Sequence, residues 1–569
     1  GGAGADELTG GTGDDTVDVG GFTVLGNLLL AAGSNTVRLD NGANIVGATV
    51  TAVDGSFVID LADGATATVS STDLGLASGI VGAGGSETVI VDTSVGGALT
   101  GYTLDRDIEN WQIGTFGDGD NSVTMGADSQ NVTFGNGTNT LFASAAQIAG
   151  STVQGGTGTD SLEITGILGS FNFDAASADV SAVETLVIDE TQNTAQIATQ
   201  ADMTNITLSD AGGFVGASTT LVLASTASTT VQGDTSNRTV NVIGTSMADD
   251  ALLTTQGSDL AGSDFVITDF KGDLSNTSVG SVEVTLANNG DGNYVITSSE
   301  AITVNNGTAQ AGDTITLSGA GNFTVTDLVA NLAADGLTGD LDVTYAADLA
   351  DNAATITAES GQLTGNVTVT GGNSTDTITV DTLDTNLQTF TAAASGAKFD
   401  VTAGDGAQNI TGSAQNDTIT GGAGADELTG GAGADDFVYT NSADSTTSFA
   451  ATSYEFDTIT DFTTAQGDTL SVGGALAAAI NGPGGFDAGA GPVPVGVNFN
   501  TALANVVFDA DLAFAGGASA ALVISDASGD GEFLAGNYLL IDSNGTGDFT
   551  AEVDTIIYLG ANTVVATDF

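Results

Sequence analysis

Short runs in which apolar and polar residues alternate recur along the chain. Examples are FVITDF (265–270), SVEVTLANNGDGNYVIT (281–297) and DTITLSGAGNFTVT (313–326). Alternation with a period of two predicts strands with one buried face, and the Asn-Gly, Asp-Gly and Gly-rich segments between them are typical of turns. One segment, DLVANLAAD (327–335), predicts a short helix that ends before Gly336. The pattern predicts an all-β fold, in which residues 201–360 form either a sandwich or a continued solenoid.

A nine-residue period is superimposed on this alternation. Three consecutive units, GSAQNDTIT, GGAGADELT and GGAGADDFV, begin at residue 412, and two more, GGAGADELT and GGTGDDTVD, occupy 1–18. Each follows the pattern G-G-x-G-x-D-x-U-x, where U is apolar. A fixed period with glycine, carboxylate and apolar residues in register indicates a calcium-binding parallel β-solenoid, or β-roll.

Each place of the repeat has a physical role. Glycines at places one, two and four allow positive φ, so that the turn can aim its carbonyl oxygens inward. The aspartate at place six adds an anionic oxygen to these carbonyl oxygens. Together they form an oxygen-rich cage, which suits Ca²⁺. The apolar residue at place eight (Ile419, Leu428 and Phe437) is expected to point into the solenoid. The predicted ligands of these clean repeats are Asp6, Asp15, Asp417, Gly421, Gly422, Gly424, Asp426, Gly430, Gly431, Gly433 and Asp435.

Degenerate copies of the repeat lie elsewhere. Residues 155–163 match fully and carry Asp160, whereas 371–379 is a weaker copy that carries Asp376. Across 116–142 Asn121 and Asn139 replace the aspartate. Asparagine keeps a turn-forming side chain but gives up the charge, so these coils are expected to stack without metal. Whether any one degenerate copy binds an ion stays open.

Further acidic segments contain residues that could either bind calcium or have a purely structural role. The loops at 526–537 and 542–549 place oxygens at the alternate spacing of hard-ion ligands; these are Asp526, Asp530, Asp542, Asn544 and Asp548. The alternative for both loops is a hairpin turn rich in Asp and Asn. Glu109 and Glu184, in two similar turn-to-strand phrases, either pair locally or bind calcium.

The charge balance limits the partners. The net charge is -66, from 71 acidic residues against 5 basic ones, so binding to nucleic acid through phosphate contacts is excluded. Because 41% of residues are hydrophobic, the chain is expected to fold, with bound cations relieving its self-repulsion. We therefore expect several calcium ions as cofactors.

Two missing residue types limit the chemistry. There is no Cys and no His, which excludes disulfides, zinc sites with those ligands, and catalysis through histidine or cysteine. A pair of carboxylates would suffice for a glycosidase, but nothing singles out a pair, and we predict that the chain is not an enzyme. No apolar run predicts a membrane span. The chain starts within a repeat and without a signal peptide, which suggests a portion of a longer polypeptide.

The repeats resemble the RTX family, the calcium-binding repeats of proteins exported by Gram-negative type I secretion. In that family two units make one coil, so the turns of one side lie eighteen residues apart. The resemblance implies that Asp417 pairs with Asp435 and Asp426 with Asp444, whereas Gln408 departs from the motif. It also implies that Asp6 and Asp15 need partners upstream, because place six of the next coil falls on a valine, residue 24.

The segment after the repeats resembles the carboxy-terminal region of serralysin-type RTX proteins. FVYTNSADS (437–445) is followed by FDTITDF (456–462) and GDTLSV (467–472). Asp457 and Asp461 are candidate ligands or caps. VVATDF (564–569) is similar to uncleaved type I secretion signals. Serralysins also carry a zinc protease motif that needs histidine, so that activity is not expected here.

Together these features predict six regions. They are an RTX-like roll (1–48), a β-rich connecting domain (49–115), a degenerate solenoid (116–200), a β-rich inserted region (201–360), a carboxy-terminal RTX roll (361–447) and a β-rich cap with the secretion signal (448–569).

The composition and the secretion tail resemble those of RTX-type bacterial surface-layer proteins. This implies a secreted structural protein at the cell surface that assembles with copies of itself into a lattice and is anchored to outer-membrane lipopolysaccharide or surface polysaccharide. The alternative is a calcium-dependent RTX adhesin or polysaccharide-binding matrix module, with Trp111, Phe116 and Phe134 as candidate sugar-stacking residues unless they are core.

Overall fold

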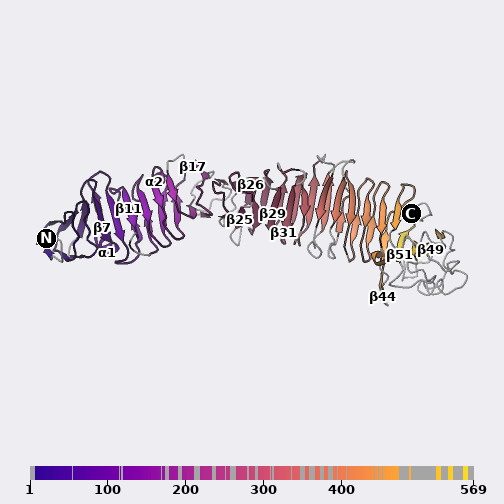
Figure 1. The fold of residues 1–569 in the computed structure, drawn as a ribbon, viewed down its shortest axis with the longest axis horizontal. Helices are drawn as coiled ribbons and strands as arrows, with labels where there is room; N and C mark the ends of the chain where they lie inside the picture. The colour runs from indigo at the N-terminus through magenta and orange to yellow at the C-terminus, as the bar shows by residue number, and fades with distance from the viewer. Residues whose placement is uncertain are drawn as a thin grey trace. The chain divides into compact units, whose positions relative to one another are not determined.

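The fold is known from a computed structural model. It describes residues 7–53, 56–114, 116, 119–167, 170–173, 178–189, 195–209, 218–233, 239–249, 251–256, 264–277, 281–288, 292–307, 309–310, 313–334, 336–346, 353–357, 366–371, 377–381, 389–393, 395–404, 406–440, 442–445, 448–450, 453–472, 486–487, 521–526, 536–541 and 555–561. The chain divides into two compact units, Gly1–Ser281 and Val282–Phe569. Each unit consists of short parallel strands stacked in successive coils (Figure 1).

The first unit contains five stacks of parallel strands. The first two stacks are β1 (Leu8–Thr9), β3 (Asn27–Leu30) and β5 (Thr49–Ala52), then β2 (Thr16–Asp18), β4 (Ser34–Leu39), β6 (Ser56–Leu61) and β8 (Ile80–Gly82). The third is β7 (Thr66–Ser70), β9 (Thr88–Asp92), β11 (Asn110–Ile113), β13 (Asn131–Phe134), β15 (Thr152–Gln154) and β18 (Asp179–Ser181). The fourth is β10 (Thr100–Thr103), β12 (Ser122–Thr124), β14 (Thr140–Ser144), β16 (Ser161–Thr165), β19 (Thr185–Asp189), β21 (Asn205–Ser209), β23 (Thr229–Gln232), β25 (Leu252–Gln256) and β27 (Asp273–Asn276). The fifth is β17 (Ser170–Asn172), β20 (Ala195–Ala198), β22 (Ser218–Val222), β24 (Thr239–Ile243) and β26 (Asp264–Phe270).

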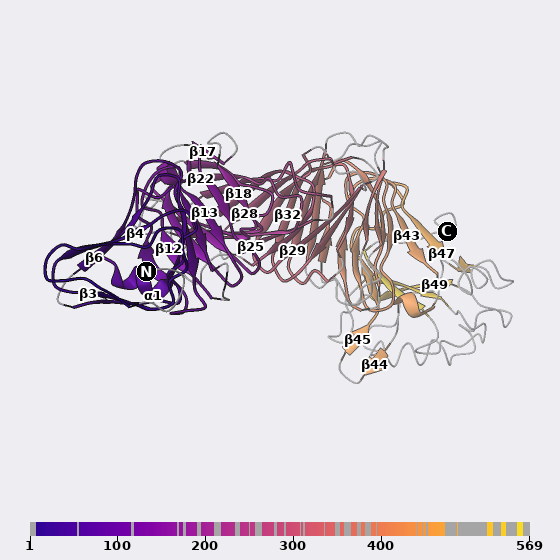
Figure 2. The same ribbon diagram turned by 60° about the vertical axis from the view of Figure 1, so that its left-hand side comes forward.

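The second unit has two main stacks, seen in a turned view in Figure 2. One is β28 (Val282–Leu286), β30 (Ile302–Asn305), β32 (Phe323–Leu328), β34 (Leu341–Tyr345), β36 (Val367–Gly371), β38 (Thr389–Thr391), β40 (Asn409–Thr411), β42 (Glu427–Thr429) and β46 (Asp457–Ile459). The other is β29 (Asn293–Ser298), β31 (Thr314–Ser318), β33 (Asn331–Ala333), β35 (Ala353–Thr357), β37 (Thr377–Asp381), β39 (Lys398–Thr402), β41 (Thr418–Thr420), β43 (Asp436–Tyr439) and β47 (Thr469–Val472).

The carboxy-terminal strands complete the second unit. They are the hairpin β44 (Ser448–Ala450) and β45 (Ser453–Glu455), and β48 (Phe486–Asp487), β49 (Ala521–Asp526), β50 (Gly536–Ile541) and β51 (Thr555–Gly560). Strand β50 pairs antiparallel with both β49 and β51, whereas β51 also pairs in parallel with β46. The last parallel coil is therefore joined to a strand about a hundred residues further along the chain.

Apolar residues in register form the core of these coils. In the second unit one column contains Tyr294, Ile315, Leu332, Ile356, Val380, Val401, Ile419, Phe437 and Leu470, each in register with the next. All are fully buried, as is Leu428 apart from 1% of its surface. The prediction that place eight of the repeat points inward is confirmed, and so is the parallel β-solenoid fold.

Coil length varies along the chain. The step is 18 residues from Val401 to Ile419 and again from Ile419 to Phe437, whereas Leu332 pairs with Ile356. The pairing register tolerates such insertions because extra residues lengthen the turns and leave the strands aligned. The nine-residue period is therefore visible in the sequence only where the turns are short.

In the middle region the structure decides between the two predicted folds and contradicts the predicted helix. Strands described between 201 and 360 pair in parallel, so this part continues the solenoid and is not a sandwich. The predicted helix at 327–335 is wrong, because its described residues end β32 and form β33, whose Leu332 belongs to the core column. The alternation and the stacking neighbours outweigh the helical propensity of this alanine-rich segment.

Helices are few among the described residues. They are α1 (Ser71–Leu76), α2 (Ala145–Ile148) and the 3₁₀ turn η1 (Ser442–Ser445). Ser70 and Asp73 form a reciprocal capping box at the start of α1, as Ser144 and Gln147 do for α2. No helix in the described ranges is both long and apolar enough to cross a bilayer.

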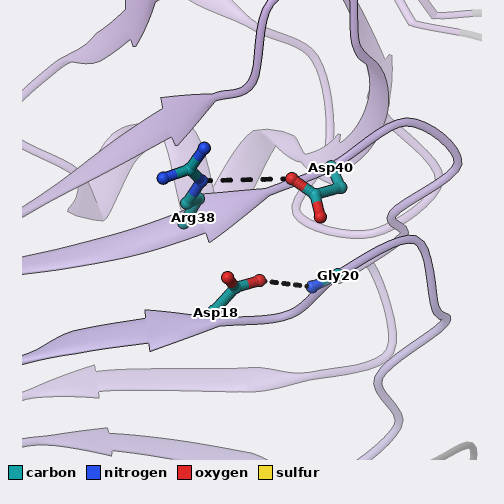
Figure 3. A network of polar contacts seen from close by, with 4 residues as sticks. All are labelled: Asp18, Gly20, Arg38 and Asp40. Atoms are coloured by element: carbon teal, nitrogen blue, oxygen red, sulfur yellow. Dashed lines mark hydrogen bonds and ion pairs between the residues drawn. The ribbon is translucent and has the colours of Figure 1, made fainter.

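A row of opposite charges helps to set the register of the first coils. Arg38 on β4 lies between Asp18 on β2 and Asp60 on β6 in the pairing register. Arg38 Nε is 4.0 Å from Asp40 Oδ1, and Asp18 Oδ1 accepts a hydrogen bond from the Gly20 amide at 2.9 Å (Figure 3). These groups are exposed, so the row contributes to the register more than to the stability.

Candidate calcium sites

The aspartate of each repeat folds back against the glycine at place one. A Cβ placed on Gly412 would lie 2.6 Å from Asp417 Oδ2, and one placed on Gly10 would lie 2.8 Å from Asp15 Oδ2. At Gly421 and Gly430 it would overlap the carboxylates of Asp426 and Asp435. Glycine is needed here because any side chain would push the carboxylate out of the turn.

The glycines at places two and four are needed for a different reason. Gly431 and Gly433 have φ of +104° and +137°, which is unfavourable for other residues. A Cβ on either would meet a carbonyl oxygen of the coil before, and the same holds for Gly422 and Gly424. The turns of neighbouring coils therefore stack with their carbonyl-bearing backbones in close contact.

The aspartates at one edge of the roll form a ladder. Asp417 Oδ1 accepts the Phe399 amide at 2.8 Å, and Asp435 Oδ1 accepts the Asp417 amide at 2.9 Å. Asp468 Oδ1 in turn accepts the Asp435 amide at 3.1 Å. The structure thus brings Asp417 and Asp435 together at a spacing of eighteen residues, as the resemblance implies.

The sequence analysis missed Asp468. It lies in GDTLSV, in the segment that resembles the serralysin carboxy-terminal region, and the preceding coil is longer than eighteen residues, so the fixed period did not reach it. A local signal exists, because Asp468-Thr-Leu has the same order as Asp417-Thr-Ile. The same acidic-polar-apolar order marks the last rung of the ladder.

The second edge differs from the predicted pairing. Asp426 Oδ1 accepts the Gln408 amide at 2.8 Å, and Asp457 Oδ1 accepts the Asp426 amide at 2.9 Å. Asp457, and not Asp444, therefore occupies the next rung. Residues 440–456 are inserted between the coils, and the next strand is β46, so Asp444 is not the next rung; its carboxylate still lies near enough to Asp426 to help raise the pKa of that group.

Gln408 replaces the motif aspartate with an amide that donates. The surrounding oxygens assign its orientation, with Nε2 donating to Asp426 Oδ1 (2.9 Å), Gly421 O (3.0 Å) and Gly406 O (3.1 Å). An NH₂ group thus bridges a carboxylate and two backbone carbonyls of neighbouring turns. This departure from the motif fills the space between two turns without a metal.

Asp444 lies close to this edge but outside the ladder. Its Oδ2 accepts hydrogen bonds from the Thr440 amide (2.5 Å) and hydroxyl (2.9 Å). The fully buried Ser445 beside it accepts the Asp457 amide and donates to the carbonyl of Ile556 on β51. Asp461, a candidate ligand or cap, accepts the amides of both Gly430 and Gly431, which is the arrangement of a cap.

Several buried carboxylate oxygens lack a hydrogen-bond partner. Among them are the Oδ2 atoms of Asp15, Asp160, Asp426 and Asp435. The Oδ2 of Asp417 differs, because it accepts the Ser413 amide at 2.5 Å. Buried polar atoms are normally paired, so these oxygens call for a partner that donates or carries positive charge.

The pKa shifts of these aspartates also indicate that a cation belongs between the turns. Burial raises the pKa of Asp426 and of Asp435 to about 7, with neighbouring carboxylates adding to the shift. Burial also raises the pKa of Asp417, Asp468 and Asp457. A cation between the turns would reverse this effect by stabilising the ionised forms.

The donor set fits calcium. It consists of carboxylate and carbonyl oxygens, which hard cations prefer. No three carboxylates of the described residues converge as a closed metal cluster. Backbone carbonyls, held close by the glycine turns, would therefore supply most of the ligands, and the aspartates would supply the charge.

The amino-terminal repeats have a different partner from the one expected. Asn35 Oδ1 accepts the Asp15 amide at 3.2 Å, so the next coil supplies a partner twenty residues downstream. The coil is longer than eighteen residues, so the next rung is Asn35; that the Asp15 carboxylate also needs upstream residues stays a prediction. Asp6 lies outside the described residues, as do Asp376, Asp530, Asp542, Asn544 and Asp548. Asp526 ends β49, and its side chain is likewise not described.

The degenerate coils show how asparagine replaces the aspartate. The side chains of Asn121, Asn139 and Asp160 occupy equivalent rungs on successive coils. Glu184 Oε2 accepts the Asp160 amide, and Glu109 Oε2 accepts the Glu87 amide, so both glutamates pair with a neighbouring coil. The degenerate repeats thus keep the ladder even where the charge is lost.

Comparison with protein families agrees with the geometry. Residues 1–23 and 402–437 match the RTX calcium-binding nonapeptide repeat, in four copies. No curated protein is significantly similar to the chain. The match contains Asp15 and the rungs from Gln408 to Asp435, and it leaves the longer coils between them unassigned. The chain therefore carries RTX calcium-binding nonapeptide repeats within a parallel β-solenoid, as secreted calcium-binding β-roll proteins do.

Proposed function

We propose that the chain is a structural surface-layer protein that folds on binding extracellular calcium and assembles into a two-dimensional lattice on the cell surface. The observation that supports this proposal most directly is the set of buried carboxylate oxygens without a hydrogen-bond partner in the turns, the Oδ2 atoms of Asp15, Asp426 and Asp435. A fold with this feature needs cations to be stable, and calcium is abundant outside cells and scarce within them.

The charge supports coupling between calcium and export. With a net charge of -66, the chain repels itself strongly when no divalent ion is bound. Calcium binding then contributes directly to folding, because the ligands come together only in the folded state. The chain would remain unfolded in the cytosol, pass through a type I secretion channel and fold outside.

Assembly is supported by the outward faces of the stacked strands. In the second unit one outward row contains Thr368, Thr391, Thr411 and Thr429, each in register with the next, and Thr460 follows directly after β46. The hydroxyls of Thr429 and Thr460 are 2.7 Å apart. A regular polar surface with few basic groups suits contacts between copies that divalent ions bridge. Lipopolysaccharide or surface polysaccharide is the proposed anchor.

The adhesin alternative loses most of its proposed sugar platform. Trp111 and Phe134 are 1% and 5% exposed and belong to the core, whereas Phe116 is 56% exposed. Of the three candidate residues only Phe116 is exposed, and one ring is a weak platform for a polysaccharide, which leaves the structural role as the better proposal.

The test is assembly of the purified chain followed by electron microscopy. Ordered sheets are expected in millimolar calcium, are expected to dissolve in chelator, and should re-form when calcium returns. Retention on a glycan column by a soluble monomer, without sheets, would favour the adhesin. Sheets that survive chelation would argue against calcium-gated assembly.

A further inference from the structure

A second carboxylate pair lies in the first unit, outside the residues that match the repeat family. Four side chains form a ladder over successive coils: Asn121, Asn139, Asp160 and Glu184. Asn139 Oδ1 accepts the Asn121 amide at 3.2 Å, and Asp160 Oδ1 accepts the Asn139 amide at 2.8 Å. Glu184 Oε2 accepts the Asp160 amide at 2.8 Å. The ladder therefore changes from amides to carboxylates at Asp160.

The two asparagine rungs are self-sufficient. Asn121 Nδ2 donates to Gly119 O in its own coil and to Asn139 Oδ1 in the next, both at 2.8 Å. Asn139 Nδ2 likewise donates to Gly137 O (3.3 Å) and to Asp160 Oδ1 (2.8 Å). In each coil an NH₂ group supplies positive partial charge between a turn carbonyl and the next side chain.

At Asp160 that NH₂ group is replaced by an oxygen. The side chain is 1% exposed, and its Oδ2 has no hydrogen-bond partner. The next rung is the Glu184 carboxylate, which is also an acceptor. Two carboxylates thus meet across the coils with no donor between them, so the position filled by nitrogen in the asparagine coils lacks positive charge here.

A backbone oxygen converges on the same place. A Cβ on Gly155 would lie 2.7 Å from Asp160 Oδ2 and would overlap the carbonyl oxygen of Ala182. Both oxygens therefore border the space beside the Gly155 α-carbon. Ala182 has φ of +51°, a left-handed conformation that is costly for alanine, and its amide donates to Asp202 Oδ2 at 3.0 Å. The chain keeps this strained residue where its carbonyl faces a buried carboxylate.

We propose that Asp160, Glu184 and the Ala182 carbonyl form a calcium site between the coils at 155–163 and 179–189. All three donors are oxygens, and the two carboxylates neutralise a divalent ion. Glu184 is partly exposed, which provides a path for the ion and room for water to complete its coordination. This site goes beyond the matched repeats because a glutamate, 24 residues from Asp160, replaces the second aspartate.

The test replaces Asp160 by the residue that the neighbouring coils use. In the full chain, Asp160→Asn should keep the ladder, since Asn139 shows that an amide is accommodated. The number of calcium ions retained after equilibrium dialysis is expected to fall by one, and the melting temperature in chelator should rise above that of the wild type. Glu184→Gln should weaken the same ion at least tenfold. Glu283→Gln, on the exposed outer face of strand β28, is the matched control and should change neither quantity.

The outcomes separate this site from the roll. If Asp160→Asn binds as many ions as the wild type, the proposal is overturned. If Asp160→Asn does not fold, Glu184→Gln decides, because an unchanged ion number and affinity in that variant rejects the site. If Asp435→Asn loses an ion while Asp160→Asn does not, the roll binds calcium and this inference alone fails. A wild-type chain that retains no calcium would overturn both.

Discussion

Calcium affinity should fall steeply as the pH drops through 7. Burial places the pKa of Asp426 and Asp435 at about 7 in the metal-free fold, against an ordinary value of 3.8. Calcium binds the ionised carboxylate, so protons compete with it in this range. For one group with a pKa of about 7, the ionised fraction falls from about nine-tenths at pH 8 to about one-tenth at pH 6.

The expected change is roughly tenfold in the association constant, or about 1.4 kcal/mol, for each such carboxylate at an ion. Calorimetric titration at pH 8, 7 and 6 measures it directly. Titration at pH 7 in buffers of different ionisation enthalpy should also show about half a proton released per carboxylate. Asp435→Asn is the matched variant, and its remaining sites should show a smaller total pH dependence.

The metal-free chain should respond in the opposite direction. A raised pKa means that the folded state holds more protons than the unfolded state between about pH 4 and 7. Without calcium, stability is therefore highest at the acidic end of this window and is lost as the pH rises to 7. With saturating calcium the trend reverses. Equal calcium affinity at pH 6 and pH 8 would refute the assignment of these carboxylates as buried ligands.

Three substitutions test the packing of the roll. Gly431→Ala should cost at least about 1–2 kcal/mol, because φ is +104° and the new Cβ meets a carbonyl of the preceding coil; Gly75→Ala in α1, where a Cβ meets nothing within 4 Å, should be neutral or stabilising in the same thermal melts. Gln408→Leu should cost about 1–3 kcal/mol with or without calcium, since it removes the side-chain donor of Gly421 O and Gly406 O and one of the two donors of Asp426 Oδ1; a loss seen only with calcium would contradict the bridging amide. Ile419→Ala should cost about 2–5 kcal/mol in denaturant titrations, and a loss below about 1 kcal/mol would mean that place eight is not packed.

Much of the roll could be predicted from local pattern. The pairing of Asp417 with Asp435 could be predicted because the coil between them is made of two nine-residue units. Asp457 could not be predicted as the next rung after Asp426, because the chain inserts η1 and the β44–β45 hairpin before the next coil. A periodic rule carries no information about where an insertion leaves and re-enters the stack.

The sequence by itself determined the strand pattern, the inward place-eight residues, the need for glycine beside each aspartate and the choice of an oxygen-loving cation. These follow from alternation and backbone sterics, which act over a few residues. Only the tertiary structure decided which coils stack on which, because parallel pairing joins residues that lie 17 to 33 positions apart between Asn293 and Val472, joins Asp457 to Ile557 at β46–β51, and depends on the length of every turn between them. That stacking made Asp457, Asp468 and Glu184 rungs of the ladders, and it left Asp160 without the amide that its neighbours supply.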